Sequence, residues 1–165
     1  MSRSSFPAGL ANEDATLSDR VVKLTTADGG TTFNLTPETH ANRLIVLDPA
    51  LGPATINLPF AYGTGDVYEI VLAAAVGSGS IVINATHHGT TSCKILGSVT
   101  SIDSSNATAD VFLSSTNDIM TLTPANTGGA GGDYIKLVDV GSQVWRTVGC
   151  VVHHTGDTPA TPFSG

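Results

Sequence analysis

Charged side chains are scarce in this chain, making up 13% of its 165 residues, about half the usual quarter. The helix-favouring polar residues are the rarest, with three Glu, one Gln and three Lys. A surface helix exposes such side chains along its outer face, and the chain has too few to cover several helices. Threonine and glycine, with 22 and 18 residues, instead suit strands and tight turns. The composition predicts an all-β protein.

Other features that the sequence lacks limit the partners that the protein is expected to have. Proteins gain affinity for nucleic acids when their basic side chains release counterions from the phosphate backbone. With a net charge of −7, this chain is not expected to have a nucleic-acid partner. The N-terminus lacks the apolar segment of a secretory signal. The longest uncharged apolar run, residues 70–76, is far shorter than the roughly twenty residues of a membrane helix, so no membrane partner is expected. The two cysteines, Cys93 and Cys150, are predicted to be reduced and buried.

Signatures of catalysis are also missing. The chain has no Gly-x-Ser-x-Gly elbow, and Glu38 and Glu69 lack the partner signature of a two-carboxylate site. The histidine pairs His87-His88 and His153-His154 have metal-binding side chains, but neighbours on a strand point to opposite faces. Exposed loop histidines are therefore favoured over a zinc site. The chain is interpreted as a non-enzyme without a cofactor or a metal.

The glycine run at residues 128–132 invites comparison with a phosphate-binding loop, which requires a helix N-terminus after it. Here a strand beginning at Asp133 follows, and its carboxylate would repel phosphate. The run is therefore interpreted as a flexible turn.

Residues 127–152 are the most informative stretch, because two runs rich in β-branched and aromatic residues flank Gly-Ser-Gln. This pattern predicts a β-hairpin. In the first run Ile135 and Leu137 alternate with Tyr134 and Lys136, as in a strand with one buried face. The second run is predicted to place Trp145 on one face and four apolar residues on the other (Val144, Val148, Cys150 and Val152). Trp145 is the only Trp, and it is expected to contribute strongly to a core or an interface.

Upstream, short strands alternate with turns rich in Gly, Ser and Asn. About ten or eleven such strands in the whole chain predict a single-domain antiparallel β-sandwich or jelly roll. Asp28-Gly29, between β-rich residues 21–25 and 31–35, indicates a hairpin, and residues 36–38 are suited to begin one helical turn. No internal repeat indicates a solenoid or a propeller.

The two ends of the chain show no periodicity. The sandwich is therefore predicted to span residues 20–152, between a flexible N-terminal arm (residues 1–19) and a C-terminal tail (residues 153–165). Each end carries one Phe in a polar context, Phe6 and Phe163. A lone aromatic in a tail has no local core to join, so both are expected to contact a neighbouring protein on binding.

Several segments together carry a resemblance: ATINLP (54–59), GTGDVYEIVLAA (63–74), GSIVINA (79–85), TGGAGGDYIKLVDV (127–140), QVWRTVG (143–149) and TPATPFSG (158–165). Over residues 43–165 the chain resembles capsid decoration, or cement, proteins of jelly-roll type from tailed bacteriophages. The matching segments are turn and core signatures, and the family brings no catalytic residues to carry over.

The resemblance implies a virion structural protein, made in the host cytoplasm, that binds the outside of the capsid. Its partners would be the major capsid protein and itself, as a homotrimer rather than a dimer, and it would stabilise the shell by bridging neighbouring subunits. The expected core or interface anchors are Trp145, Tyr134, Ile70 and Tyr68, with Phe6 and Phe163 as arm and tail contacts.

Two other functions remain open from the sequence. One is a phage tail-fibre or tail-tip module, whose strands and turns share the same patterns. The other is a carbohydrate-binding, lectin-like β-sandwich in which Tyr62, Tyr68 and Trp145 stack on a sugar ring.

Overall fold

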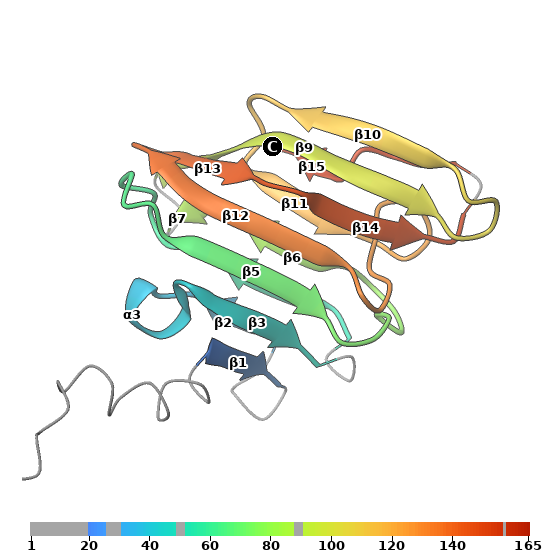
Figure 1. The fold of residues 1–165 in the computed structure, drawn as a ribbon, viewed down its shortest axis with the longest axis horizontal. Coiled ribbons are helices and arrows are strands. Elements are labelled where there is room, and N and C mark those ends of the chain that lie inside the picture. The colour runs from blue at the N-terminus through green and yellow to red at the C-terminus, as the bar shows by residue number, and fades with distance from the viewer. Residues whose placement is uncertain (1–19, 26–30, 49–51, 88–90, 157) are drawn as a thin grey trace, which may run out of the picture.

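Two β-sheets packed face to face form the protein (Figure 1). The computed structural model describes residues 20–25, 31–48, 52–87, 91–156 and 158–165. The predicted all-β sandwich is confirmed, since strands dominate and the described residues hold one helical turn, α3 (Pro37–His40), which follows Thr36 as the sequence indicates.

The large sheet has eight strands. From one edge to the other they are β1 (Val21–Leu24), β3 (Arg43–Leu47), β5 (Val67–Leu72), β12 (Tyr134–Gly141), β13 (Val144–Thr147) with β14 (Cys150–His154), β9 (Lys94–Asp103) and β10 (Ala109–Ser114). The small sheet has five, in the order β15 (Phe163–Ser164), β11 (Ile119–Leu122), β6 (Ile81–Asn84), β4 (Ala54–Asn57) and β2 (Thr32–Asn34). A separate short ladder joins β7 (Thr86–His87) to β8 (Thr91–Ser92).

The first half of the chain winds between the two sheets. From β1 to β6, each strand lies in the sheet opposite to the strand before it. As a result β1, β3 and β5 pair in parallel in the large sheet, and β2, β4 and β6 pair in parallel in the small one. Parallel strands need a crossover connection, and here the crossover is the intervening strand of the other sheet. The sandwich is therefore mixed, and the prediction of antiparallel pairing throughout is wrong.

The hairpin predicted at Asp28-Gly29 is also wrong. Those two residues lie outside the described ranges, but the strands on either side belong to different sheets. Val21 pairs with Leu44, and Thr32 pairs with Thr55. An alternating pattern shows that one face of a strand is buried, but it does not specify the strand's partner. The winding is also not visible as an internal repeat in the sequence, because its successive strands share no sequence motif.

The hairpin predicted in residues 127–152 is confirmed, since β12 and β13 pair antiparallel around Ser142. The predicted facing of its second strand is wrong. The chain bends at Gly149, whose φ of 63° lies in the left-handed region that favours glycine. The bend shifts the alternation by one residue between β13 and β14. Trp145 therefore points into the same interior as Cys150 and Val152.

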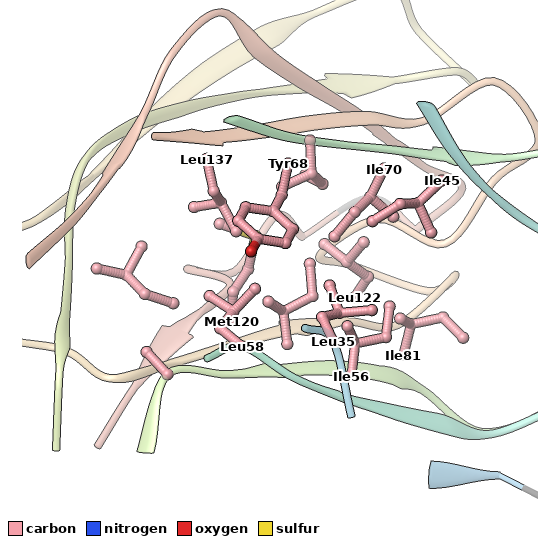
Figure 2. Packing of buried hydrophobic residues seen from close by; sticks show 14 of the residues in the cluster. Leu35, Ile45, Ile56, Leu58, Tyr68, Ile70, Ile81, Met120, Leu122 and Leu137 are labelled. Carbon is pink, nitrogen blue, oxygen red and sulfur yellow. The ribbon is translucent and has the colours of Figure 1, made fainter. Parts of the chain in front are cut away.

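The core fills the space between the two sheets (Figure 2). Three of the four predicted anchors, Trp145, Tyr68 and Ile70, are fully buried there. The rings of Trp145 and Tyr68 meet edge to face, with centroids 5.3 Å apart. Both cysteines are free and buried, as predicted.

The predicted C-terminal tail is instead part of the sandwich. His153 and His154 belong to β14, and Phe163 pairs with Met120 and is buried in the core. Phe163 is therefore a core residue and not a tail contact. A two-residue strand that follows two prolines is too short to show periodicity. The predicted N-terminal arm, with Phe6, lies outside the described residues.

Candidate interaction surface

The outer face of the large sheet is the broadest open surface of the sandwich. The small sheet packs on the inner face, and Figure 1 shows no described element over the outer one. Successive side chains of a strand point to opposite faces. On β12, Ile135 and Leu137 point into the core, so Tyr134, Lys136 and Val138 lie on the outer face.

One row of outward side chains crosses six neighbouring strands. Strand pairing aligns its members one beside the next, and each is half-buried or exposed. They are Val46, Val71, Tyr134, Val151, Thr100 and Val111. The row carries no charge and forms an apolar band across the sheet. Contiguous apolar surface of this kind marks interaction sites on soluble proteins.

Tyr134 lies near the middle of this apolar band, between Val71 and Val151. It is the only one of the four predicted anchors that faces solvent, because the other three are fully buried. Burial and the neighbouring Glu69 carboxylate raise the pKa of the Tyr134 hydroxyl, so the side chain stays neutral. A neutral aromatic ring with a polar tip is a common interface anchor.

Beside the apolar band lies a basic groove of about 370 Å³ over β3, β5 and β12. Its charged lining consists of Arg20, Arg43, Lys136 and Glu69. Lys136 Nζ lies 2.8 Å from Glu69 Oε1, which leaves an excess of positive charge in the groove. The exposed Arg146 adds another cation to the same face. The outer face is thus locally basic in a chain of net charge −7.

The two glutamates Glu38 and Glu69 lie on different elements of the structure. Glu69 is ion-paired with Lys136 on the outer face, and Glu38 lies in the first turn of α3. The three aromatic residues expected to stack on a sugar ring in a lectin-like protein do not share one surface. Tyr68 and Trp145 are buried, and of the three only Tyr62 is exposed, at 75%.

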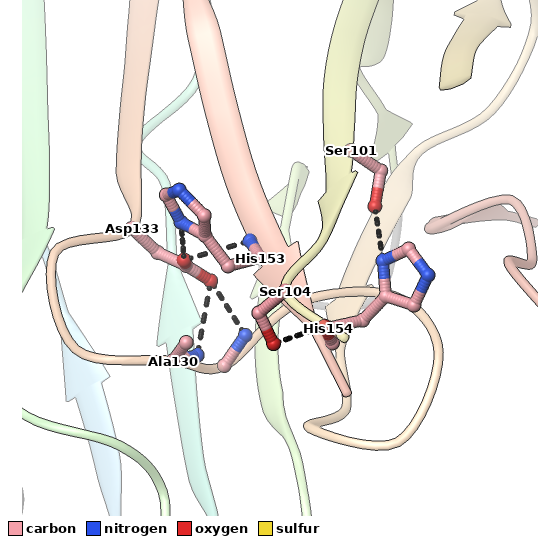
Figure 3. A network of polar contacts seen from close by, with 7 residues as sticks. Ser101, Ser104, Ala130, Asp133, His153 and His154 are labelled. Carbon is pink, nitrogen blue, oxygen red and sulfur yellow. Dashed lines mark hydrogen bonds and ion pairs between the residues drawn. The ribbon is translucent and has the colours of Figure 1, made fainter. Parts of the chain in front are cut away.

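The C-terminal histidine pair has a structural role (Figure 3). His153 is half-buried, and its Nδ1 lies 2.9 Å from Asp133 Oδ1. His154 is fully buried, with Nδ1 3.0 Å from Ser101 Oγ. The two rings diverge as expected for strand neighbours, but the prediction that they are exposed in a loop is wrong. The described residues contain no cluster of three or more metal-capable side chains; the His87 side chain and His88 are outside that description.

Asp133 fixes the glycine-rich loop, which is not a free turn (Figure 3). Its Oδ2 accepts hydrogen bonds from the N–H groups of Gly129 and Ala130, at 2.6 and 3.2 Å. Its Oδ1 accepts one from the His153 N–H at 2.9 Å. Burial raises the pKa of the Asp133 carboxyl, and the donors of Gly129 and His153 oppose that rise. An acid directly after a glycine run was the available signal for such an anchor.

Asp139 holds a second loop in the same way. Its carboxylate accepts hydrogen bonds from the N–H groups of Tyr62, Gly63 and Thr64, at 3.0, 2.6 and 3.1 Å. The Thr64 hydroxyl donates a further bond at 3.0 Å. These contacts fix the loop that carries the exposed Tyr62. Nothing in the sequence near Asp139 signals this role, because its partners lie far away along the chain.

Acid is expected to destabilise the fold through Asp139. Burial raises the pKa of this carboxyl, but the Thr64, Gly63 and Tyr62 donors outweigh burial and hold the pKa below its ordinary value. The folded pKa is therefore lower than the unfolded one. The stabilisation is present above the unfolded pKa and is lost as the pH falls through the folded pKa, below about 4.

Thermal melts from about pH 6 to about pH 3 measure this loss. Asp139→Asn should be less stable than the wild type at the upper pH and should lose less stability on acidification, so that the two curves converge. Parallel curves would show that the Asp139 carboxylate contributes nothing to acid sensitivity.

Comparison with protein-family models and with curated proteins finds no match for this chain. Among the described residues, no helix has the length and apolar character needed to cross a membrane.

Proposed function

We propose that this chain is a virion structural protein, a capsid decoration protein of a tailed bacteriophage. The outer face of its large sheet binds the outside of the major capsid shell. The observation that carries this proposal is the apolar band centred on Tyr134, beside a basic groove, on an open sheet face. A flat, rigid face with an apolar centre and charged margin has the composition of a protein interface.

Binding to such a face stabilises a shell by simple linkage. A ligand that binds the assembled shell and not its separated subunits favours assembly by an amount that grows with the ratio of its free concentration to its dissociation constant. The sandwich contributes rigidity, since its core and both anchored loops are ordered before contact. Little conformational entropy is then lost on docking, which favours affinity. The basic groove suits an acidic strip on the partner, because complementary charges steer encounter and fix orientation.

The alternative of a tail-fibre or tail-tip module uses the same face with a different partner. The two proposals are separated by the particle that binds the chain. The full chain is incubated separately with shells that lack the protein and with purified tails of the same phage. Each mixture is then sedimented to measure the bound protein. Binding to shells alone supports the decoration role, and binding to tails alone supports the tail module.

Tyr134→Ala is expected to weaken binding to undecorated shells at least about 30-fold, because a central aromatic anchor contributes about 2 kcal/mol or more. Its melting temperature should change little, since Tyr134 is only half-buried and faces away from the core. Titration of shells with labelled protein gives the dissociation constant.

Tyr62→Ala is the matched control, because it removes an exposed aromatic ring from a loop outside the apolar band. It should bind like the wild type. Loss of binding in Tyr62→Ala with full binding in Tyr134→Ala would move the interface to the loop held by Asp139. Binding to neither shells nor tails by the wild type would reject both virion roles, and the exposed Tyr62 would then justify a glycan-binding screen.

A further inference from the structure

Among the edge strands that the structure describes, β10 is the longest. Sheet edges offer free N–H and C=O groups to other chains, and proteins protect them with short strands, charges, prolines or bulges. The other described edges are protected in this way. β15 and β2 have two and three residues, and β1 carries Lys23 and begins directly after Arg20. β10 has six residues, a single charged side chain at Asp110, no Lys or Pro, and unbroken pairing with β9.

The free groups of this edge can be assigned from the ladder with β9. Asp103 N–H donates to Thr108 C=O at 2.9 Å, which makes this pair a hydrogen-bonded one. Bonding alternates along an antiparallel ladder. The N–H and C=O groups of Ala109, Val111 and Leu113 therefore point away from β9, toward the open side.

The side chains of the same residues are apolar and exposed. Leu113 and Val111 are 77% and 63% exposed, and Leu113 is the most exposed large hydrophobic residue in the described part of the chain. The edge therefore presents unpaired backbone groups and unburied aliphatic surface at the same three positions. An edge of this kind is a template for strand addition.

We propose that β10 pairs antiparallel with β10 of a second copy of this chain, about a two-fold axis at Phe112. In this register Val111 lies opposite the second copy's Leu113, so two aliphatic pairs form on the outer face. Phe112 lies opposite its own copy, and Asp110 lies opposite Ser114, so no like charges meet. Aromatic and aliphatic cross-strand pairs are the favourable ones, and an isologous contact of this type closes as a dimer.

The dimer joins the two large sheets into one continuous sheet. The apolar band ends at Val111 on β10, so pairing continues it into the second copy. This inference concerns self-association and does not depend on the proposed capsid role. It gives a two-fold dimer, whereas the resemblance favours a trimer.

Leu113→Lys tests the edge in the full-length chain. Analytical ultracentrifugation over a range of concentrations should show a dimer for the wild type. The variant should show a dissociation constant at least about 30-fold larger, because each copy brings a cation into an apolar pair. Val140→Lys is the matched control, since Val140 is also exposed, at 50%, but belongs to β12. It should dimerise like the wild type.

Phe112→Cys tests the register directly. Only this position faces itself across the axis, in a non-hydrogen-bonded pair whose Cβ atoms are about 4.5–5.5 Å apart, close to disulfide range. Mild oxidation should yield a disulfide-linked dimer, whereas the exposed Ser115→Cys should not. The natural cysteines are buried and do not interfere. A monomeric wild type, a trimer, or a dimer that Leu113→Lys leaves intact would each overturn the proposal, as would equal cross-linking of the two cysteine variants.

Discussion

Trp145→Ala is expected to lower the free energy of unfolding by about 3–5 kcal/mol, the usual cost of removing a large aromatic from a core. Trp145 is 1% exposed and lies between the two sheets, so its removal leaves a cavity that the surrounding sheets, each held rigid by its own hydrogen-bond ladders, cannot fully close. The edge-to-face contact with Tyr68 is lost as well. Since small domains have a total stability of about 5–15 kcal/mol, the variant should be partly unfolded or poorly soluble. Urea denaturation followed by circular dichroism measures the loss.

Two variants control this experiment. Trp145→Phe should lose much less stability than Trp145→Ala, because it keeps an aromatic ring beside Tyr68. It also removes an indole N–H that has no hydrogen-bond partner among the described residues. Tyr62→Ala, which removes an exposed ring, should leave stability nearly unchanged. If Trp145→Ala denatured at the wild-type urea concentration, the packing of the core around Trp145 would be misassigned.

Much of the fold was predictable because it rests on local patterns. Alternation on β12 follows from one buried face, and this strand lies where the sequence places it. Pairing was less predictable, since it depends on contacts between distant segments. β1 and β2 look like the arms of a hairpin, yet each pairs with a strand one full winding later.

The face of Trp145 illustrates a second limit. A single bend at Gly149 reverses the alternation for all residues after it, so a pattern counted through residues 144–152 assigns the wrong side. Phe163 illustrates a third, because a buried aromatic in a two-residue strand has no periodic neighbours. In both cases the periodicity of the sequence does not identify the buried side chain.

The sequence identified one residue of the candidate surface but not the extent of that surface. Four core or interface anchors were expected, and Tyr134 is the one that lies on the outer face. The apolar band itself is assembled from six strands that the winding brings together. The basic groove likewise combines Arg20 and Arg43 with Lys136, residues that are far apart along the chain.

Neither loop anchor was predicted, since Asp133 was interpreted only as a charge that repels phosphate and Asp139 has its partners far away along the chain. Asp133 and Asp139 are buried, and each accepts several backbone hydrogen bonds. A buried carboxylate is stable only when its oxygens are paired. Their positions on β12 and at its start place one anchored loop at each end of the strand that carries Tyr134. The loops at both ends of β12 are thus fixed by buried carboxylates.

Asp133→Ala is accordingly expected to cost about 3–5 kcal/mol of stability, nearly as much as the loss of Trp145. The change leaves the N–H groups of Gly129, Ala130 and His153 without their acceptor, and each unpaired buried donor costs about 1–3 kcal/mol. The loop also loses both contacts of this carboxylate with His153 of β14. Amide hydrogen exchange should show faster exchange at Gly129 and His153, and urea denaturation should show the global loss.

The matched controls are Asp133→Asn and Asp110→Ala. Asparagine keeps one oxygen acceptor in place, so Asp133→Asn should retain part of the stability that Asp133→Ala loses. Asp110 lies on the edge strand β10, half-buried, and its removal should change stability by less than about 0.5 kcal/mol. Should Asp133→Ala unfold at the same urea concentration as Asp110→Ala, the glycine-rich loop would be held by its own backbone conformation, and the hydrogen bonds of Asp133 would contribute no net stability.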